Sequence, residues 1–311
     1  MNQVLLKPAE AASRVRRRSN SPEPSRRMVL QPRDIALLTE VYAYGSMLRG
    51  QIQALHFGSV PRTNARLRQL YDGRFLQRAQ LELPATSPVA TGCQFGYLLG
   101  PAGIPIVAAE LGIDPADVRA QLRRGTPGYL LHTIDIVTFR LAVEASARTC
   151  AAVQLKQFLP ERLCRHAYEV RPKTADGQAR ESRWHLEVFK PDAVFLIAHN
   201  GVLTGFAVEI DRGHTSASEF SCKLAIHARY AATGLFTGRY GAHCAGTLIV
   251  TTSARRRDNL AAIAAQAAAA ITSDSTSLTL AYRHSRRYKP MLISANRFSG
   301  TDVKTNALRR I

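Results

Sequence analysis

The sequence predicts an α/β fold, α+β overall, in which a unit of short helices precedes a larger unit built on a mixed sheet. Two observations support this prediction. Apolar residues recur at helical spacing through much of residues 32–150, whereas strand-length apolar runs alternate with helical patterns after residue 151. The chain has 311 residues, 46% of them hydrophobic and 21% charged, which is the composition of a globular protein with room for two domains.

The chain is strongly basic, with 42 Lys and Arg residues against 23 Asp and Glu and a formal net charge of +19. This excess favours nucleic acid as the partner, because basic side chains release counterions from phosphates; an anionic membrane surface is the weaker alternative. No apolar run reaches the ~20 residues of a membrane span. The five cysteines contain no Cys-x-x-Cys pair, which fits a reducing compartment. We therefore expect a cytoplasmic protein that binds double-stranded DNA and no membrane.

The two ends of the chain differ from its centre. Residues 1–31 are rich in Arg, Ser and Pro and lack the apolar core of a signal peptide, which predicts a disordered basic arm that touches phosphates. We expect residues 301–311 to form a basic tail. Between these ends the sequence predicts three parts, namely residues 32–100, 101–150 and 151–300.

Residues 32–100 have the pattern of a winged helix. The segments "PRDIALLTEVYAYGSM", "LRGQIQALHFG" and "SVPRTNARLRQLYDG" predict three short helices, each ended or broken by Gly, as in a helix-turn-helix core. The segments "RFLQRAQLELP" and "CQFGYLLG" then predict two strands around a loop of Pro, Ser and Thr, which would form the wing.

The third of these helices carries a polar stripe that could enter a major groove. Arg62, Arg66 and Gln69 follow the i, i+4, i+7 spacing on one face, while Leu67 and Leu70 lie on another. An amphipathic helix with a solvated basic face is the simpler alternative. The residues predicted to contact DNA are Arg62, Asn64, Arg66, Arg68, Gln69, Arg74 and Arg78.

Residues 101–150 predict a helical connector, with a short helix in "GPAGIPIVAAELG" and a longer one in "LLHTIDIVTFRLAVEASART". The sequence favours His132, in the longer helix, as a packed or capping histidine rather than a catalytic one.

Residues 151–300 predict an α/β sandwich with a mixed sheet. A helix is expected from about Ala151, followed by strands in "RWHLEVF", "DAVFLIA" and "LTGFAVEID". The turn "HNG" predicts that the last two of these strands pair antiparallel. Helices in "ASEFSCKLAIHARYAA" and "RDNLAAIAAQAAAAI" then alternate with strands in "GTLIVTT" and "SLTLAYR".

Three carboxylates in this second region are candidates for a metal site. Side chains alternate along a strand, so Glu209 and Asp211 share one face, and Asp192 at the start of the paired strand can join them. Clustered carboxylates repel one another, and a divalent cation that prefers oxygen ligands relieves the repulsion. We therefore expect Mg²⁺ or Mn²⁺ to be held by Asp192, Glu209 and Asp211.

A lysine on the following helix completes the predicted catalytic set of Asp192, Glu209, Asp211 and Lys223. Ser216 and Glu219 form a capping-box pattern that fixes the helix start and places Lys223 on a stripe that can lean toward the carboxylates. In metal-assisted phosphodiester cleavage such a lysine steadies the attacking water or the phosphorane charge. In the alternative, Lys223 faces solvent and the carboxylates pair with basic neighbours: Arg212, Arg229 or Lys190.

At these motifs the chain resembles the bacterial replication-relaxation family of plasmids and other mobile elements. The resemblance covers roughly residues 32–252 and depends on "RDIALLTEVY", "RLRQLYDGRFLQR", "YLLGPAG", "LLHTIDI", "KPDAVF", "FAVEIDRG" and "KLAIHARY" in that order. It implies an N-terminal winged helix and a restriction-endonuclease-like, PD-(D/E)xK-type α/β domain. Asp192 and Glu209 would be its two acids, while Asp211 stands where that pattern has lysine, and Lys223 would be the replacement.

These observations predict a DNA-binding protein of a plasmid or mobile element that nicks or cleaves duplex DNA with a divalent metal. The alternative is a non-enzymatic DNA-binding regulator, or a replication or mobilisation accessory, with a catalytically silent nuclease-like domain. A homodimer and contacts with replication or mobilisation proteins stay open. No phosphate-cradling G-x-x-x-x-G-K-[ST] loop is present, which argues against ATP-driven activity.

Overall fold

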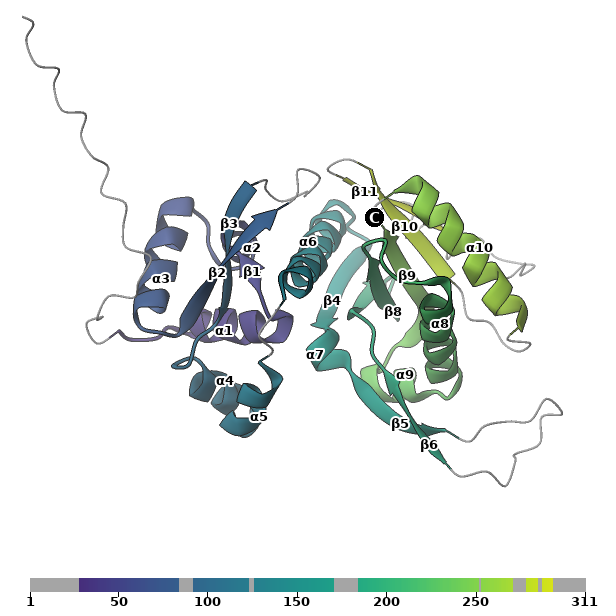
Figure 1. The fold of residues 1–311 in the computed structure, drawn as a ribbon, viewed down its shortest axis with the longest axis horizontal. Coiled ribbons are helices and arrows are strands. Elements are labelled where there is room, and N and C mark those ends of the chain that lie inside the picture. Colours follow the sequence, from purple (N-terminus) through teal and green to yellow (C-terminus); the bar gives the residue numbers. More distant parts are fainter. Residues whose placement is uncertain are drawn as a thin grey trace, which may run out of the picture.

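The computed structural model describes residues 28–83, 92–122, 126–170, 184–251, 253–270, 278–284 and 287–292. The predicted α/β class is confirmed, with helices and a mixed sheet in one chain (Figure 1). Most of the predicted basic arm and all of the predicted tail lie outside the described residues.

Three helices and a small antiparallel sheet form the N-terminal part. β1 pairs with β3 and β3 with β2, giving the order β1-β3-β2. The predicted three helices and two-stranded hairpin are therefore present, together with a short additional strand. The elements are α1 (Pro32–Tyr44), β1 (Met47–Leu48), α2 (Arg49–His56), α3 (Val60–Asp72), β2 (Leu76–Leu83) and β3 (Gly92–Leu99).

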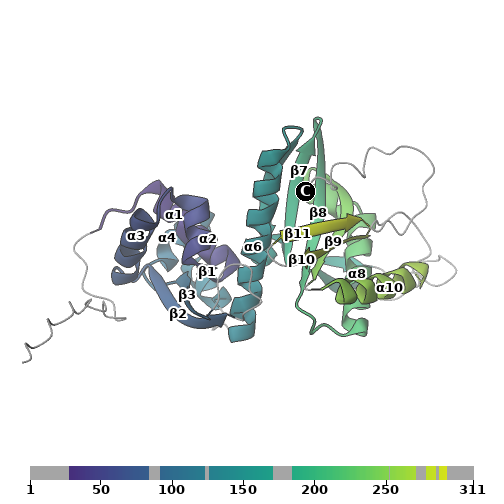
Figure 2. The same ribbon diagram turned by 90° about the horizontal axis from the view of Figure 1, so that it is seen from above.

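Three helices follow, α4 (Ile104–Leu111), α5 (Pro115–Gln121) and α6 (Pro127–Thr149). Thr126 caps the start of α6 by accepting a hydrogen bond from the Tyr129 N–H, and Pro127 occupies the first turn, where a missing N–H costs nothing. α6 stands between the N-terminal elements and the large sheet (Figures 1 and 2), so this helix of the predicted connector lies inside the fold and packs on both sides, whereas α4 packs on α1.

The large sheet has six strands in the order β11-β10-β9-β8-β7-β4. β7 pairs antiparallel with β4 and β8, whereas β8, β9 and β10 run parallel, so the sheet is mixed as predicted. β5 and β6 form a separate two-stranded ribbon. The strands are β4 (Val153–Pro160), β5 (His166–Val170), β6 (His185–Phe189), β7 (Ala193–His199), β8 (Val202–Asp211), β9 (His243–Thr251), β10 (Leu278–His284) and β11 (Arg287–Leu292); the helices are α7 (Glu161–Cys164), α8 (Ala217–Ala232), α9 (Leu235–Tyr240) and α10 (Ala254–Ala270).

The prediction of a helix from about Ala151 is wrong. The segment is strand β4, followed by the four-residue helix α7. A bulge between Leu155 and Gln157 breaks the two-residue alternation, so Val153, Leu155 and Phe158, which all contribute to the same core cluster, are spaced by two and then three positions. Because this spacing lacks the regular alternation of a strand, the sequence pattern did not predict a strand here.

Helices cover both faces of the large sheet. α6 packs on one face, where Phe195 stacks on Phe158 and on Phe206 and meets Phe139 of α6 edge-on. On the other face α8 and α10 lie over β9 (Figure 1), and Phe220 and Leu260 pack with Ile249. The strands between these layers are buried on both faces, which explains their continuous apolar sequences.

The turn between β7 and β8 fixes the register that positions the site. Asn200 and Gly201 both have positive φ angles, 49° and 80°, as the predicted two-residue hairpin turn requires. The resulting antiparallel register pairs Ala193 at the start of β7 with Val208 near the end of β8. Asp192 therefore lies beside Glu209, as the sequence predicted.

Replacing Phe195 by Ala tests this packing. We expect Phe195→Ala to lower the free energy of unfolding by about 3–5 kcal/mol, because it leaves a cavity among three aromatic rings. Val202→Ala, at an exposed position of the same hairpin, should change it by less than ~0.5 kcal/mol. Urea unfolding followed by circular dichroism measures both; equal effects would contradict the packing.

Candidate functional site

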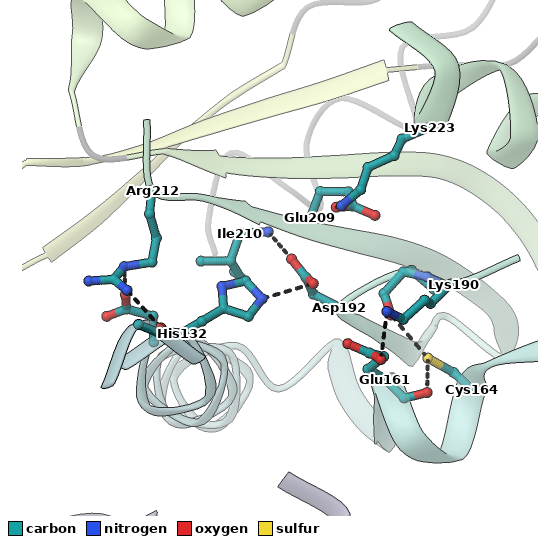
Figure 3. Close-up of polar contacts among 12 residues, drawn as sticks. His132, Glu161, Cys164, Lys190, Asp192, Glu209, Ile210, Arg212 and Lys223 are labelled. Atoms are coloured by element: carbon teal, nitrogen blue, oxygen red, sulfur yellow. Dashed lines mark hydrogen bonds and ion pairs between the residues drawn. The ribbon is translucent and has the colours of Figure 1, made fainter. Parts of the chain in front are cut away.

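Asp192 lies at the point where β7 begins, and the residue is 6% exposed. Its N–H donates to the Val208 carbonyl at 2.9 Å, and its Oδ2 accepts the Ile210 N–H at 2.7 Å. The carboxylate therefore accepts the hydrogen bond that a backbone carbonyl would otherwise accept at the end of the β7–β8 pairing. Its other oxygen, Oδ1, is 2.9 Å from Nε2 of His132 on α6 (Figure 3).

Glu209 lies on β8 and faces α8, with 5% of its surface exposed. Its Oε2 accepts a 2.7 Å hydrogen bond from Nζ of Lys223 (Figure 3). Its Oε1 is buried and, within the described part of the chain, has no hydrogen-bond partner; Nε2 of His227 is 3.4 Å away without hydrogen-bond geometry. Burial lowers the pKa of His227 to about 3, so this imidazole is neutral and does not balance the carboxylate.

Burial and the nearby charge of Asp192 raise the pKa of Glu209 to about 8. Burial also acts to raise the pKa of Asp192, but the hydrogen bond and charge of His132, together with Lys223, lower it below its ordinary value. The two carboxylates thus differ in character, since Asp192 is held ionised and Glu209 resists ionisation. Such divergence between neighbouring acids is common at functional sites and also occurs in structural networks.

Asp211 does not join this pair. It lies on the same face of β8, but Arg256 of α10 binds both its oxygens at 2.8 and 3.0 Å, and Thr251 donates to it at 3.1 Å. The ion pair lowers the pKa of Asp211 against the effect of burial. The expected convergence of three carboxylates is therefore wrong at this residue, and among the described residues no three His, Cys, Asp or Glu side chains are placed to hold a metal ion.

The alternative in which Lys223 only faces solvent is also wrong. Lys223 is 46% exposed, yet its amine reaches Glu209, and the capping box of Ser216 and Glu219 that predicted its register is present. The basic residues proposed as alternative partners pair elsewhere: Arg212 with Asp135 at 3.2 Å, Arg229 with Glu187 at 2.6 Å and Lys190 with Glu161 at 3.1 Å.

Two residues of this environment were missed by sequence reasoning. His132 was interpreted as packed or capping, yet it contacts Asp192 across 60 positions of sequence. Arg256, which neutralises Asp211 across 45 positions, was not singled out. Both residues lie on helices, and no local sequence pattern predicts where these helices pack on the sheet.

The remaining pair, Asp192 and Glu209, fits a magnesium-type ion. Mg²⁺ keeps several waters and is commonly bound by one or two carboxylates together with substrate phosphates, so a third carboxylate is not required. Oε1 of Glu209 is a buried oxygen with no hydrogen-bond partner in the described ranges. A cation there would offset the repulsion from Asp192 that, together with burial, raises the pKa of this group.

Three of the seven residues predicted to contact DNA are partly buried arginines engaged within the protein. Arg66 forms an ion pair with Asp34 of α1, which is fully buried, and also donates to the Val29 carbonyl. Arg68 pairs with Asp72 at 2.8 Å. The Arg78 guanidinium lies over the Tyr71 ring at 4.2 Å, between α3 and the sheet.

The other four predicted residues lie on the surface of the N-terminal part. Arg62 and Asn64 are exposed on α3, and Arg74 is exposed just after it with a positive φ of 59°. Gln69 is exposed and accepts a hydrogen bond from Arg66 at 2.7 Å. The surface available to a phosphate backbone is therefore smaller than the sequence pattern indicated.

Fold and site together define a mixed-sheet α/β protein with a buried carboxylate pair at one end of a central hairpin. The chain belongs to the replication-relaxation family, whose family model matches residues 38–244. This match confirms the resemblance and spans both α3 and the carboxylate pair. No curated protein and no solved structure matches the chain. Within the described ranges, no helix combines the length and apolar character that crossing a membrane requires.

The raised pKa of Glu209 predicts a pH dependence of stability. Between about pH 4.5 and 8 the unfolded chain releases this proton while the folded protein keeps it, so the free energy of unfolding falls as pH rises through that window. Glu209→Gln removes this pH-dependent contribution. As pH rises through the window, we expect the free energy of unfolding of the variant to increase relative to that of wild type by about 1 kcal/mol per pH unit.

Urea unfolding in EDTA at several pH values measures this difference. Glu110→Gln, which replaces an exposed carboxylate of α4, is the matched control and should stay parallel to wild type. A constant difference between Glu209→Gln and wild type across the window would show that Glu209 is ionised throughout.

Proposed function

We propose that the chain binds duplex DNA and that Asp192, Glu209 and Lys223 form a site that nicks or cleaves phosphodiester bonds with Mg²⁺ or Mn²⁺. The cleavage would serve the replication or mobilisation of a plasmid or other mobile element, which agrees with the replication-relaxation family. The observation that carries the proposal is the buried pair of carboxylates beside a partly exposed lysine. One of these carboxylates has an oxygen without a hydrogen-bond partner in the described part of the chain.

Each residue has a defined role in this proposal. A divalent cation would lower the pKa of a bound water and so supply the nucleophile. Asp192 is oriented by its two hydrogen bonds and would bind the cation together with Oε1 of Glu209. Lys223 keeps its proton because the carboxylates raise its pKa against burial, and its exposed amine would donate to the phosphorane oxygens.

The N-terminal part supports the DNA-binding half of the proposal. Three short helices followed by an antiparallel hairpin are the elements of a winged helix, and α3 would be the helix that enters the major groove. Arg62, Asn64 and Arg74 present polar groups to solvent on and beside this helix. The net charge of +19 supplies the general attraction for phosphate.

A specific observation favours the non-enzymatic alternative. His132 and Lys223 already place donors and positive charge against Asp192 and Glu209, so protein groups offset much of the cost of burying the carboxylates without a metal. In that case the domain is a catalytically silent scaffold, and the protein acts as a DNA-binding regulator or accessory.

Incubation with supercoiled plasmid separates the two functions. With Mg²⁺ or Mn²⁺ the wild-type protein is expected to convert supercoiled plasmid to open-circular or linear forms, and EDTA should abolish the conversion. Asp192→Asn keeps an acceptor for the Ile210 N–H but loses the charge, and it should fall to the EDTA level, as should Glu209→Ala.

Glu110→Gln should cleave like wild type, because its carboxylate is exposed on α4. Plasmid that stays supercoiled with both metals, while the protein still shifts duplex DNA on a gel, would establish the non-enzymatic alternative.

Arg62 gives the test of the proposed winged-helix surface. If it contacts one phosphate, Arg62→Ala should weaken duplex binding and reduce the slope of log K against log salt by about 1. Fluorescence anisotropy with a labelled duplex between about 50 and 200 mM salt measures the slope. Arg119→Ala, an exposed arginine of α5, is the matched control. Identical slopes for the two variants would remove α3 from the interface.

A further inference from the structure

His132 contacts the site from a helix that contributes none of the proposed catalytic residues. It lies on α6, on the face of the large sheet opposite α8, and its Nε2 is 2.9 Å from Oδ1 of Asp192 (Figure 3). An ionised carboxylate only accepts hydrogen bonds, so Nε2 carries the proton and donates. His132 thus presents a donor to Asp192 and does not offer that nitrogen to a cation.

Both oxygens of Asp192 are held in this way. Oδ1 accepts from His132 and Oδ2 accepts from the Ile210 N–H at 2.7 Å, and the two donors come from different layers of the fold. A carboxylate oxygen accepts about two hydrogen bonds, so each oxygen keeps one lone-pair direction that these two bonds do not use. The two bonds fix the plane of the carboxylate and the direction in which it can bind.

The segment of α6 that carries His132 is itself anchored on both sides. Nε2 of Gln51, on α2, donates to the Ile134 carbonyl at 2.8 Å. Arg212, directly after β8, pairs with Asp135 at 3.2 Å and donates to the Gly128 carbonyl at 3.0 Å. His132 is therefore held at a set position relative to the end of β8, where Ile210 provides the second donor.

We propose that His132 is a positioning residue that orients Asp192 for a divalent cation. The inference rests on the proposed metal site and adds a residue from α6 to it. Hydrogen-bond partners of metal-binding carboxylates hold the ligand in the geometry that the ion requires, and their removal typically weakens metal binding by about 10- to 100-fold. The same loss is expected here because without His132 the Ile210 N–H alone holds the carboxylate, through only one of its two oxygens.

Calorimetric titration with Mn²⁺ measures this effect without any requirement for catalysis. We expect His132→Ala to bind Mn²⁺ about 10- to 100-fold more weakly than wild type. His132→Gln, whose amide can still donate to Oδ1, should recover part of the loss. Asp192→Asn should abolish specific binding. His243→Ala is the matched control, because His243 is exposed at the start of β9, where it pairs with Thr204 at the opposite end of the sheet.

The possible outcomes separate the inference from the function on which it rests. Mn²⁺ affinity equal to wild type in both His132 variants, with binding still lost in Asp192→Asn, would overturn the positioning role and leave the metal site standing. Wild-type protein that binds no Mn²⁺ would overturn both. Thermal unfolding in EDTA shows whether each variant is folded. If His132→Ala is not folded, the test uses His132→Gln and His132→Asn. Mn²⁺ affinity equal to wild type in both of these variants would then overturn the proposal.

Discussion

The burial of Asp192 between α6 and the β7–β8 hairpin is the constraint on which the site depends. An ionised carboxylate taken out of water costs several kcal/mol unless hydrogen bonds and opposite charge offset that cost. Here the offset comes from the Ile210 N–H and from His132. Because these donors belong to β8 and α6, the carboxylate is stable only when hairpin and helix are docked together, and its environment is therefore set by the whole fold.

Once Asp192 is held ionised, the chemistry of Glu209 follows from its position. The hairpin register puts it beside Asp192, and side-chain alternation turns it toward α8. There Lys223 reaches Oε2, whereas no group that the structure describes donates to Oε1. Burial and the negative charge of Asp192 both oppose a second negative charge here, which is why the pKa of Glu209 rises to about 8. His132 and Lys223 place positive charge and donors beside the pair, and Oε1 of Glu209, which has no hydrogen-bond partner among the described residues, is where a proton or a cation can bind.

The sequence predicted what is local and missed what depends on docking. The Asn200-Gly201 turn and the Ser216 cap have short-range physical causes, so the hairpin register and the position of Lys223 could be derived from spacing. The polar stripe of α3 could not show that Arg66 is occupied, because its partner Asp34 lies 32 positions away on α1. Asp211 was misassigned for the same reason, since strand alternation gives its face but not the arginine that meets it there.

The position of α6 links the two halves of the proposed function. A continuous core runs from Leu37 and Leu70 in the N-terminal part, through Val137 of α6, to Phe195 and Val208 in the large sheet. Polar ties cross the same junction, because Arg140 of α6 binds Glu40 at 2.8 Å and the Tyr44 hydroxyl at 3.0 Å on α1. A duplex bound at α3 would thus be held by elements whose packing also sets the position of His132. Loosening α6 should disturb the carboxylate pair even though none of the residues proposed to contact DNA is changed.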